Sequence, residues 1–384
     1  MTASTEKRSP TRKSNAVQGK RRLLVLASKP HGMSPSQRYR FEQWAPHLAA
    51  NHGITLDFAA FESARLAELL ARPGHILAKA AWTTRDYLRR AAALQSAKSF
   101  DAVVIHREAA LIGPAIYERL LARTGTPIIF DFDDAIWSAG QAWKNGVFSR
   151  LHFPGKTSTI CKLATAVTTG NEFLARYARR RNSSVTVVPS SIELADYPPL
   201  PEASEDGKFV ICWTGSMSTL VHFEHARPAL ELLATQVPLV VKVICSDPPQ
   251  RPIRGAEMRF VRWSAENEAR DVADCHAGIM PLPDNEVSQG KGGMKALQFM
   301  GTGRPVVVSP VGVNADIVRP DYNGFLATTA DEWVNALLAL ARDRTLRARL
   351  GANARKTVEQ GFSAKISAAK FAEVVNRVVI PERH

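Results

Sequence analysis

The stretch DNEVSQGKGGMKALQFMGTGRP, residues 284–305, holds the residue types best suited to binding an anion. One apolar run precedes it and another follows, which predicts a turn from a buried strand into a helix. Lys291, Lys295 and Gln298 stand at i, i+4 and i+7, so a helix places them on one face. Lysines near a helix N-terminus oppose the helix dipole, whereas an anion bound there by amide groups and ammonium together offsets that cost. The stretch therefore predicts a phosphate site. The alternative is a solvated lysine face beside glycines that only turn the chain.

Three carboxylates crowd the end of the apolar run in IIFDFDDAIW, residues 128–137. Asp131, Asp133 and Asp134 raise one another's pKa unless a cation lies among them. One interpretation is a catalytic or acceptor-contacting carboxylate, and another is a turn-capping role. A third follows from the DxD spacing of Asp131 and Asp133, which is that of a metal–diphosphate ligand.

Further polar groups follow other strand-like runs. His106 ends the run DAVVIH, Arg107 and Glu108 follow it directly, and Arg38 and Arg40 come after the first strand. The trio is either a set of cleft residues or a structural ion pair. The arginine pair either clamps a phosphate or carboxylate bidentately or forms surface salt bridges.

The loop TGSMST, residues 214–219, follows another strand-like run and brings a glycine and several hydroxyls to a turn. Such a turn suits a phosphate or diphosphate, and the alternative is an ordinary capped turn.

The elements that must position these groups alternate between strands and helices along the chain. This rhythm predicts an α/β fold of βαβ units with parallel sheets. It is interrupted by PSSIELADYPPLPEASEDG, residues 189–207, which has four prolines and no period and is the best candidate for a linker. Because ligands bind outside the carboxyl ends of parallel strands, the residues that matter are expected just after strands, where the polar clusters lie.

Composition limits the classes of function. The 384 residues carry a formal charge of +14, and no apolar run approaches the roughly 18 residues that span a bilayer. The first 22 residues hold seven Lys or Arg against one Glu and lack an apolar segment, so we expect a disordered basic tail rather than a secretory signal. The tail is either a solubilising extension or a tether to an anionic membrane face, and no nucleic-acid motif accompanies it. Four widely spaced cysteines fit a reducing cytosol.

Several of these motifs, taken together, resemble those of one known protein family. The run PLPDNEVSQGKGGMKALQFMGTGRPVVVSPVG resembles the donor-binding segment of family 4 glycosyltransferases. SPSQRYRFEQWAPHL, HRE, DFDDAIW and VVPSSIE resemble the N-terminal domain of a bacterial subgroup of that family, so the resemblance covers roughly residues 21–375. It implies the GT-B fold, two Rossmann-like domains with parallel sheets facing across a cleft. The implied parts are a tail at 1–20, an acceptor domain at 21–195, a linker at 196–207, a nucleotide-sugar domain at 208–362, and a C-terminal helix within 363–384 that crosses back.

The resemblance also implies two glutamates eight positions apart, and this chain departs from both. Gly290 stands where the first glutamate contacts the sugar, and Gln298 stands where the second holds the ribose hydroxyls. The family's usual Arg and Lys after the first strand of the C-terminal domain are absent from TGSMST, and Lys291 and Lys295 are the obvious substitutes. Asp133 occupies about the place of a histidine that often follows the preceding strand.

The implied activity is transfer of a sugar from a UDP-, GDP- or dTDP-linked donor to a glycan or lipid-linked acceptor, with retention of configuration, without a metal and without a cofactor. The implied partners are that donor, that acceptor and an anionic membrane, and no nucleic acid. The expected location is the cytoplasm or the inner face of the cell membrane. Two alternatives stay open: a non-catalytic nucleotide-sugar-binding or assembly subunit, and a sugar-nucleotide 2-epimerase of the same fold. The expected site residues fall into three groups: catalytic Asp133, His106 and Lys295; donor-binding Gly215, Ser216, Lys291, Gly292, Gly293, Lys295 and Gln298; acceptor-side Arg38, Arg40, Arg107, Glu108 and Asp134.

Overall fold

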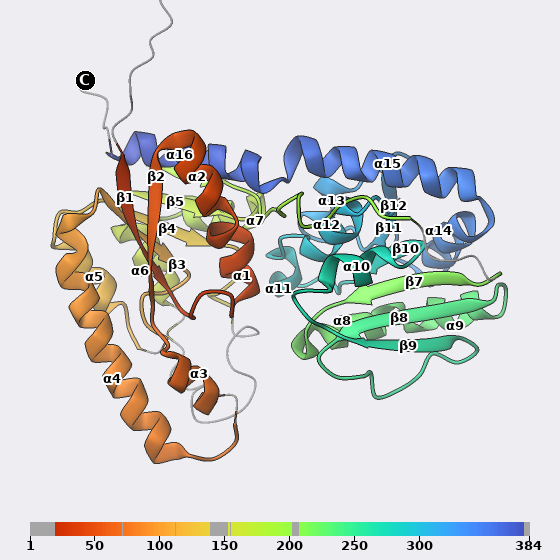
Figure 1. Cartoon of the computed structure of the whole chain (residues 1–384), viewed down its shortest axis with the longest axis horizontal. Helices are drawn as coiled ribbons and strands as arrows, with labels where there is room; N and C mark the ends of the chain where they lie inside the picture. The colour runs from red at the N-terminus through yellow and green to blue at the C-terminus, as the bar shows by residue number, and fades with distance from the viewer. Residues whose placement is uncertain are drawn as a thin grey trace, which may run out of the picture.

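The computed structural model describes residues 20–379 except 71, 112, 139–152, 154 and 202–206. Apart from Lys20, the basic tail expected at the N-terminus therefore lies outside the described residues, as does part of the expected linker. The described residues form two lobes joined side by side (Figure 1).

Each lobe is built on one six-stranded sheet in which every strand pair is parallel. The N-terminal sheet has the order β2-β1-β3-β4-β5-β6 and the C-terminal sheet has the order β12-β11-β10-β7-β8-β9. The strands are β1 (Arg21–Ala27), β2 (Ile54–Ala60), β3 (Ala102–His106), β4 (Ile128–Phe132), β5 (Ala166–Thr169), β6 (Val185–Val187), β7 (Phe209–Thr214), β8 (Leu239–Cys245), β9 (Glu257–Arg262), β10 (Ala277–Met280), β11 (Val306–Val308) and β12 (Gly324–Leu326). The order β9-β8-β7-β10-β11-β12 is that of a doubly wound dinucleotide-binding sheet, so the predicted class of two Rossmann-like α/β units is confirmed.

Helices cover both faces of each sheet. In the N-terminal lobe they are α1 (Pro35–Gln37), continued by a π-helical turn at Arg38–Glu42, α2 (Trp44–His52), α3 (Ala64–Leu70), α4 (Ile76–Gln95), α5 (Ile116–Ala122), α6 (Gly155–Leu163) and α7 (Glu172–Arg179). The helices that come after β7 along the chain are α8 (Leu220–Phe223), α9 (Arg227–Ala234), α10 (Glu268–Ala273), α11 (Glu286–Gln289), α12 (Met294–Gly301), α13 (Asn314–Ile317), α14 (Ala330–Arg342), α15 (Arg344–Gly361) and α16 (Ala364–Val379).

The continuous apolar runs of the strands follow from this two-sided cover. On β1, Leu23 and Val25 pack in the core beneath α2 and α16, whereas Leu24 and Leu26 pack in the core beneath α5, α6 and α7. Successive strand residues point to opposite faces, so a strand buried on both faces needs apolar residues at every position.

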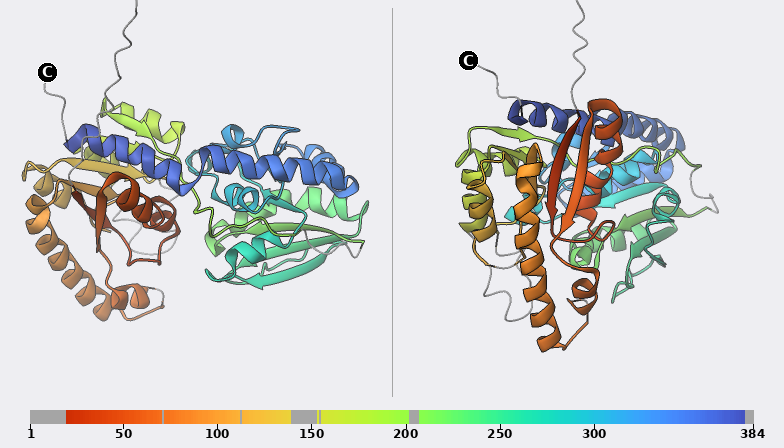
Figure 2. Two further views of the ribbon diagram at one scale, coloured as in Figure 1. Left: turned by 45° about the horizontal axis from the view of Figure 1, so that its top comes forward. Right: turned by 60° about the vertical axis from the view of Figure 1, so that its left-hand side comes forward.

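The last helix returns to the N-terminal lobe. Figures 1 and 2 show α15 lying along the C-terminal lobe and α16 continuing over the N-terminal lobe. Phe371 of α16 packs against Phe41 and Trp44, with ring centroids 5.4 and 5.9 Å away. The backbone of Ile192 also bonds Phe362 and Ala364, so the chain crosses between the lobes twice at neighbouring points.

Candidate active site

A cavity of about 400 Å³ lies between the two lobes, where loops from the carboxyl ends of both sheets meet. It is the place where open parallel sheets bind ligands. Its N-terminal wall is formed by Ser34, Pro35, Ser36, Tyr39, Arg107, Asp133, Asp134 and Ser190, and its C-terminal wall by Ser216, Ser218, Thr219, Met280, Lys291, Gly292, Gly293, Met294 and Lys295.

The C-terminal wall is built from the two loops at the switch point of the sheet. The loop after β7 begins at Gly215, where a Cβ atom would lie 2.5 Å from the Trp213 ring. The loop after β10 ends at Gly293, which has φ +69° and no room for a Cβ atom beside Ile317. Helix α12 starts immediately after Gly293 and has no side-chain cap, so its first turn meets the cavity as bare backbone. Such a helix start favours an anion.

Lys295 supplies the cation of this wall. Its Nζ atom lies 5.6 Å from the centroid of the Trp213 ring. Burial, followed by repulsion from Lys291, lowers the pKa of Lys295 to about 8. Among the described residues no carboxylate lies within ion-pair distance of Lys295, whereas Lys291 Nζ lies 2.9 Å from Asp134 Oδ1. An anionic ligand would therefore give Lys295 the ion-pair partner that the described residues do not.

Arg107 organises the carboxylates of the N-terminal wall. Its Nε atom donates to Asp133 at 2.9 Å, and its Nη2 atom donates to Asp134 at 2.8 Å. It adopts φ +63°, a backbone conformation that costs a non-glycine residue roughly 1–3 kcal/mol and that clusters at functional sites. Burial alone would raise the pKa of Asp133, but Arg107, with His106 and Arg40 behind it, lowers that pKa well below its usual range. Asp133 is therefore an anion in this cavity.

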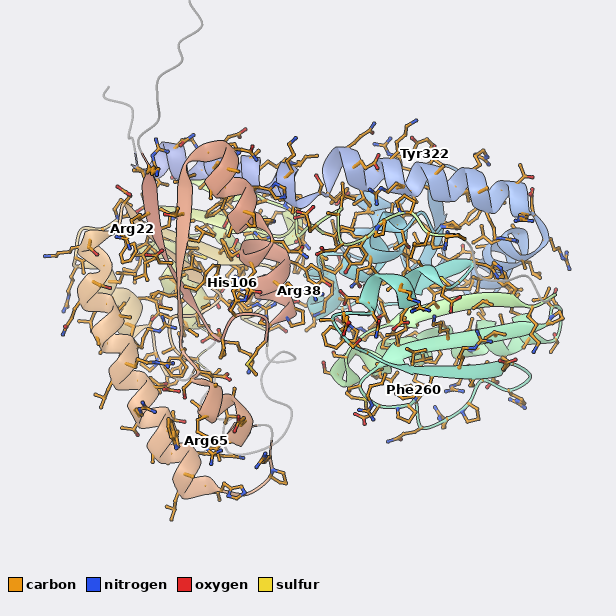
Figure 3. All side chains as sticks on the ribbon, viewed as in Figure 1. Arg22, Arg38, Arg65, His106, Phe260 and Tyr322 are labelled. Carbon is orange, nitrogen blue, oxygen red and sulfur yellow. The ribbon has the colours of Figure 1, made fainter. Side chains whose placement is uncertain are left out.

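The lobes also bond each other directly around the cavity. Arg38 donates to Glu268 across the lobe boundary at 2.6 Å, and Figure 3 places Arg38 at that boundary. Trp137 donates to Glu286 at 2.8 Å. The Asn171 side chain, which also caps α7, donates to two carbonyl groups of the loop before α12.

Gly290 of the C-terminal lobe packs closely against the N-terminal lobe. A Cβ atom there would lie 2.8 Å from the Ala135 nitrogen and 3.3 Å from a methyl group of Leu174. The glutamate that the family resemblance places at this position has no room while the lobes are in this contact.

The structure corrects the expected placement of Gln298. Its amide donates to the hydroxyl groups of Tyr39 and Tyr197, at 2.9 and 3.2 Å, and it does not line the cavity with the two lysines. The helix starts only at Met294, so Lys291 precedes it and does not share its register. Glu268 accepts hydrogen bonds from both tyrosines, which completes a buried polar cluster beside the cavity.

Arg40 and Glu108 are also placed differently from the expected acceptor side. Arg40 is fully buried and makes two hydrogen bonds to Asp131, at 2.8 and 2.5 Å, so it does not reach the cavity. Glu108 accepts a hydrogen bond from Lys156 at 2.7 Å behind the wall. His106 is buried beneath the same wall, in the position labelled in Figure 3, and lies within hydrogen-bond distance of the cavity residue Ser36.

Several hydroxyl groups of the cavity wall were not among the site residues expected from the sequence. Ser34 and Ser36 flank Pro35 just before the arginine pair, and Tyr39 lies between those arginines. The position after the first strand was the only available signal, because isolated serines and tyrosines have no diagnostic spacing.

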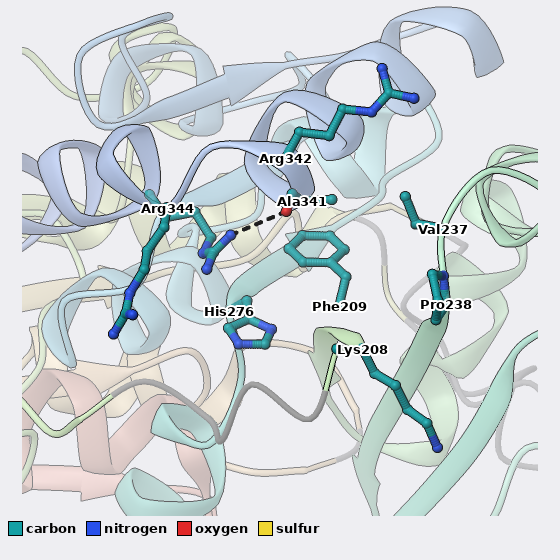
Figure 4. Close-up of a pocket in the computed structure, with 10 residues that line it drawn as sticks. Lys208, Phe209, Val237, Pro238, His276, Ala341, Arg342 and Arg344 are labelled. Carbon is teal, nitrogen blue, oxygen red and sulfur yellow. Dashed lines mark hydrogen bonds between the residues drawn. The ribbon is translucent and has the colours of Figure 1, made fainter.

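A second cavity, of about 300 Å³, lies at the opposite, amino-terminal edge of the C-terminal sheet (Figure 4). Lys208, His276, Arg342, Arg344 and Arg347 contribute to its lining. It lacks the strand-end loops that position the first cavity.

No group of three or more His, Cys, Asp or Glu side chains arranged to hold a metal is present among the described residues.

Comparison with known proteins agrees with the geometry. Residues 208–343 match the sequence model of a family described as glycosyl transferases group 1. A sequence search of curated proteins found no match.

Solved structures resemble almost the whole chain. A glycosyltransferase from Rickettsia africae has 11% identity and a TM-score of 0.66 over 95% of this chain and 100% of its own. Sucrose-phosphate synthase from Thermosynechococcus elongatus has 14% identity and a TM-score of 0.63 over 93% and 99%. HepE of Anabaena, solved with UDP and glucose, has 15% identity and a TM-score of 0.60 over 93% and 99%. At these identities the likeness shows the shared GT-B fold.

Proposed function

We propose that this protein is a glycosyltransferase that moves a sugar from a nucleotide-diphosphate sugar to a glycan or lipid-linked acceptor. One observation carries the proposal. The lysines and bare helix start of the C-terminal lobe face the carboxylates of the N-terminal lobe across a single cavity. The family match over 208–343 and the UDP and UDP-glucose complexes of the similarly folded HepE support the donor class.

The C-terminal wall would stabilise the leaving group. Breaking the bond between the sugar and the phosphate leaves negative charge on the nucleoside diphosphate, and fixed cations and amide dipoles lower the barrier to that step. The diphosphate oxygens would be bound by Lys295, by the start of α12 and by the turn at Gly215 and Ser216. Lys291 would also bind them once its ion pair with Asp134 is broken.

The N-terminal wall would hold the acceptor. Asp133 and Asp134 would orient its hydroxyl groups, while Arg107 fixes the two carboxylates. Contact between the lobes would keep water away from the electron-poor anomeric carbon. Retention of configuration and independence from metals belong to the same proposal.

One finding favours a second candidate, a nucleotide-sugar-binding subunit without activity. Gly290 has no room for the carboxylate found in the resembling family, and Gln298 is bonded to two tyrosines. A 2-epimerase of the same fold would instead isomerise the free nucleotide sugar with no acceptor present.

A thermal-shift screen of UDP-, GDP- and dTDP-sugars tests the proposal first. A ligand that binds only the native state at 100 times its Kd adds about 2.7 kcal/mol of stability, so one nucleotide class is expected to raise the Tm. Product analysis then separates the candidates: transfer to an acceptor supports the transferase, bound but unchanged donor supports the subunit, and an isomerised donor supports the epimerase. No shift with any nucleotide sugar contradicts all three.

We further propose that the protein works in surface polysaccharide or glycolipid synthesis at the cytoplasmic face of an anionic membrane. The outer face of α4 supports membrane contact. Leu77 and Leu88 on that face are 87% and 69% exposed, and Arg85 and Arg89 flank them. The only acidic residue of α4, Asp86, is buried, so this apolar face has a cationic border that complements anionic lipid. No helix in the described part of the chain is long and apolar enough to cross a bilayer.

Removing residues 1–20 is expected to weaken binding to anionic liposomes at low salt without changing the Tm, because these residues carry five Lys or Arg against one Glu. Leu77→Asp combined with Leu88→Asp is expected to weaken it further, whereas Val221→Asp, at a 53% exposed apolar position of the other lobe, leaves it unchanged. Liposome co-sedimentation measures all three. Equal binding by the truncated and wild-type proteins would exclude the tail as a tether.

A further inference from the structure

A chain of three side chains connects the core of the N-terminal lobe to the cavity. Ser36 Oγ lies 2.9 Å from His106 Nε2, and His106 Nδ1 lies 2.9 Å from Asp131 Oδ2. Ser36 lines the cavity, whereas His106 and Asp131 are 2% and 0% exposed. The sequence gives no hint of this arrangement, because 70 residues separate the serine from the histidine.

The buried end of the chain fixes the imidazole. Asp131 accepts two hydrogen bonds from Arg40 and one, at 2.6 Å, from the Thr168 hydroxyl. Burial would raise the pKa of Asp131, but Arg40 and His106 lower it, so the carboxylate is ionised and can only accept. His106 Nδ1 is therefore the donor to Asp131. In the neutral form of an imidazole the other ring nitrogen is an acceptor, and His106 Nε2 lies within hydrogen-bond distance of the Ser36 hydroxyl.

The carboxylates of the cavity are poor bases by comparison. Asp133 is held as an anion by Arg107, and its pKa lies well below the usual range. Asp134 is bonded by both Arg107 and Lys291. An imidazole is the side chain best matched to accepting a proton near neutral pH, but His106 is too deeply buried to touch a substrate. Ser36 lines the cavity and lies within hydrogen-bond distance of His106, so its hydroxyl can contact both the substrate and the imidazole.

We propose that Ser36 is a catalytic residue that takes the proton of the acceptor hydroxyl while passing its own proton to His106. This inference rests on the proposed transferase function and identifies its base. Asp131 acts through His106 and is a positioning residue, as is Arg40. Ser36 is not among the catalytic residues expected from the sequence, which are Asp133, His106 and Lys295.

The step balances. The bond from the anomeric carbon to the diphosphate oxygen breaks with its electron pair remaining on the diphosphate, and the acceptor oxygen forms a bond to that carbon on the same face, which retains the configuration. The acceptor proton moves to Ser36 Oγ, and the Ser36 proton moves to His106 Nε2. Asp131 accepts a hydrogen bond from the imidazolium, and the Asp133 carboxylate also interacts electrostatically with it. The imidazolium returns the proton to solvent after product leaves.

The test uses the full chain with the donor and acceptor identified by product analysis. Ser36→Ala is expected to lower kcat by about 10²- to 10⁴-fold, the usual contribution of general base catalysis, with the nucleotide Kd unchanged. Ser36→Thr keeps a hydroxyl and is expected to restore most of the rate. Ser158→Ala, whose hydroxyl bonds Arg181 outside the cavity, is the control with wild-type kcat.

Two readouts separate proton transfer from a structural role. His106→Gln is expected to lower kcat as Ser36→Ala does, with the nucleotide Kd unchanged. A solvent isotope effect on kcat from two moving protons is expected in the wild type and not in Ser36→Ala. A Ser36→Ala variant with near wild-type kcat, or with kcat and nucleotide affinity reduced together, overturns the relay. If the wild type transfers no sugar at all, that result refutes the transferase function itself, and it is obtained before any variant is made.

Discussion

Replacing Lys295 by alanine is expected to weaken binding of the nucleoside diphosphate by about 1–3 kcal/mol, the range for hydrogen bonds to charged groups. This corresponds to roughly 5- to 150-fold in Kd. Lys295 faces the cavity without a carboxylate partner among the described residues, so no internal ion pair offsets the lost contact. Isothermal titration calorimetry with the diphosphate of the donor class found by thermal shift measures the effect.

The same lysine makes the affinity depend on pH. Burial lowers the pKa of Lys295 to about 8, so the free protein holds the charge below that pH and loses it above. A bound diphosphate raises the pKa, so affinity is expected to be highest below about pH 8 and to fall as pH rises through it. Lys295→Arg is expected to bind with no such fall, because a guanidinium stays charged.

Lys365→Ala, at an exposed position on α16, is the matched control and is expected to leave the Kd unchanged. An unchanged affinity in Lys295→Ala would remove this lysine from the binding site and leave Lys291 as the sole candidate cation of the α12 turn.

Replacing Arg40 by methionine is expected to lower the free energy of unfolding by about 3–5 kcal/mol, because it leaves the buried Asp131 carboxylate without its cation. Both side chains are 0% exposed. Arg22→Met, which breaks the exposed pair with Asp57, is expected to cost less than about 1 kcal/mol and is the control. Chemical denaturation of each variant gives the comparison.

The pH dependence of the Arg40 effect has a definite sign. The lowered pKa of Asp131 stabilises the wild type above the unfolded value of about 4, and that stabilisation is lost as pH falls through the folded pKa. The difference in the free energy of unfolding between the wild type and Arg40→Met should therefore be largest near neutral pH and smaller in acid. Adding Asp131→Leu to Arg40→Met is expected to recover part of the loss, since no lone charge stays buried. A loss no larger than that of Arg22→Met would contradict the structural role.

The fold was predictable because its signals are local. Strands buried on both faces require unbroken apolar runs such as LLVLA, and helices between them require polar faces, so two α/β units can be predicted without any contact being known. The meeting of TGSMST and the 284–305 stretch was also predictable. Both follow strands that are neighbours in a doubly wound sheet, at its switch point.

The residues placed wrongly depend on distant contacts. Arg38 and Arg40 were expected to act as a pair, but side chains two apart on a helical turn point to opposite sides. Arg38 turns outward to Glu268 and Arg40 turns inward to Asp131. Gln298 was grouped with the lysines by spacing, yet Gly293 at φ +69° breaks the register before the helix begins. Its tyrosine partners lie 101 and 259 residues away, beyond any local signal.

Donor turnover tests the central claim most directly. The wild-type chain is incubated with each nucleotide sugar, with and without a membrane glycolipid extract, and release of the nucleoside diphosphate is measured beside transfer of the sugar. The expected result is that one donor class is consumed, with release that grows when acceptor is present and is slowed by Lys295→Ala. The proposed function would be contradicted if the wild type consumed no donor under any condition, or if Lys295→Ala consumed the donor as fast as the wild type does.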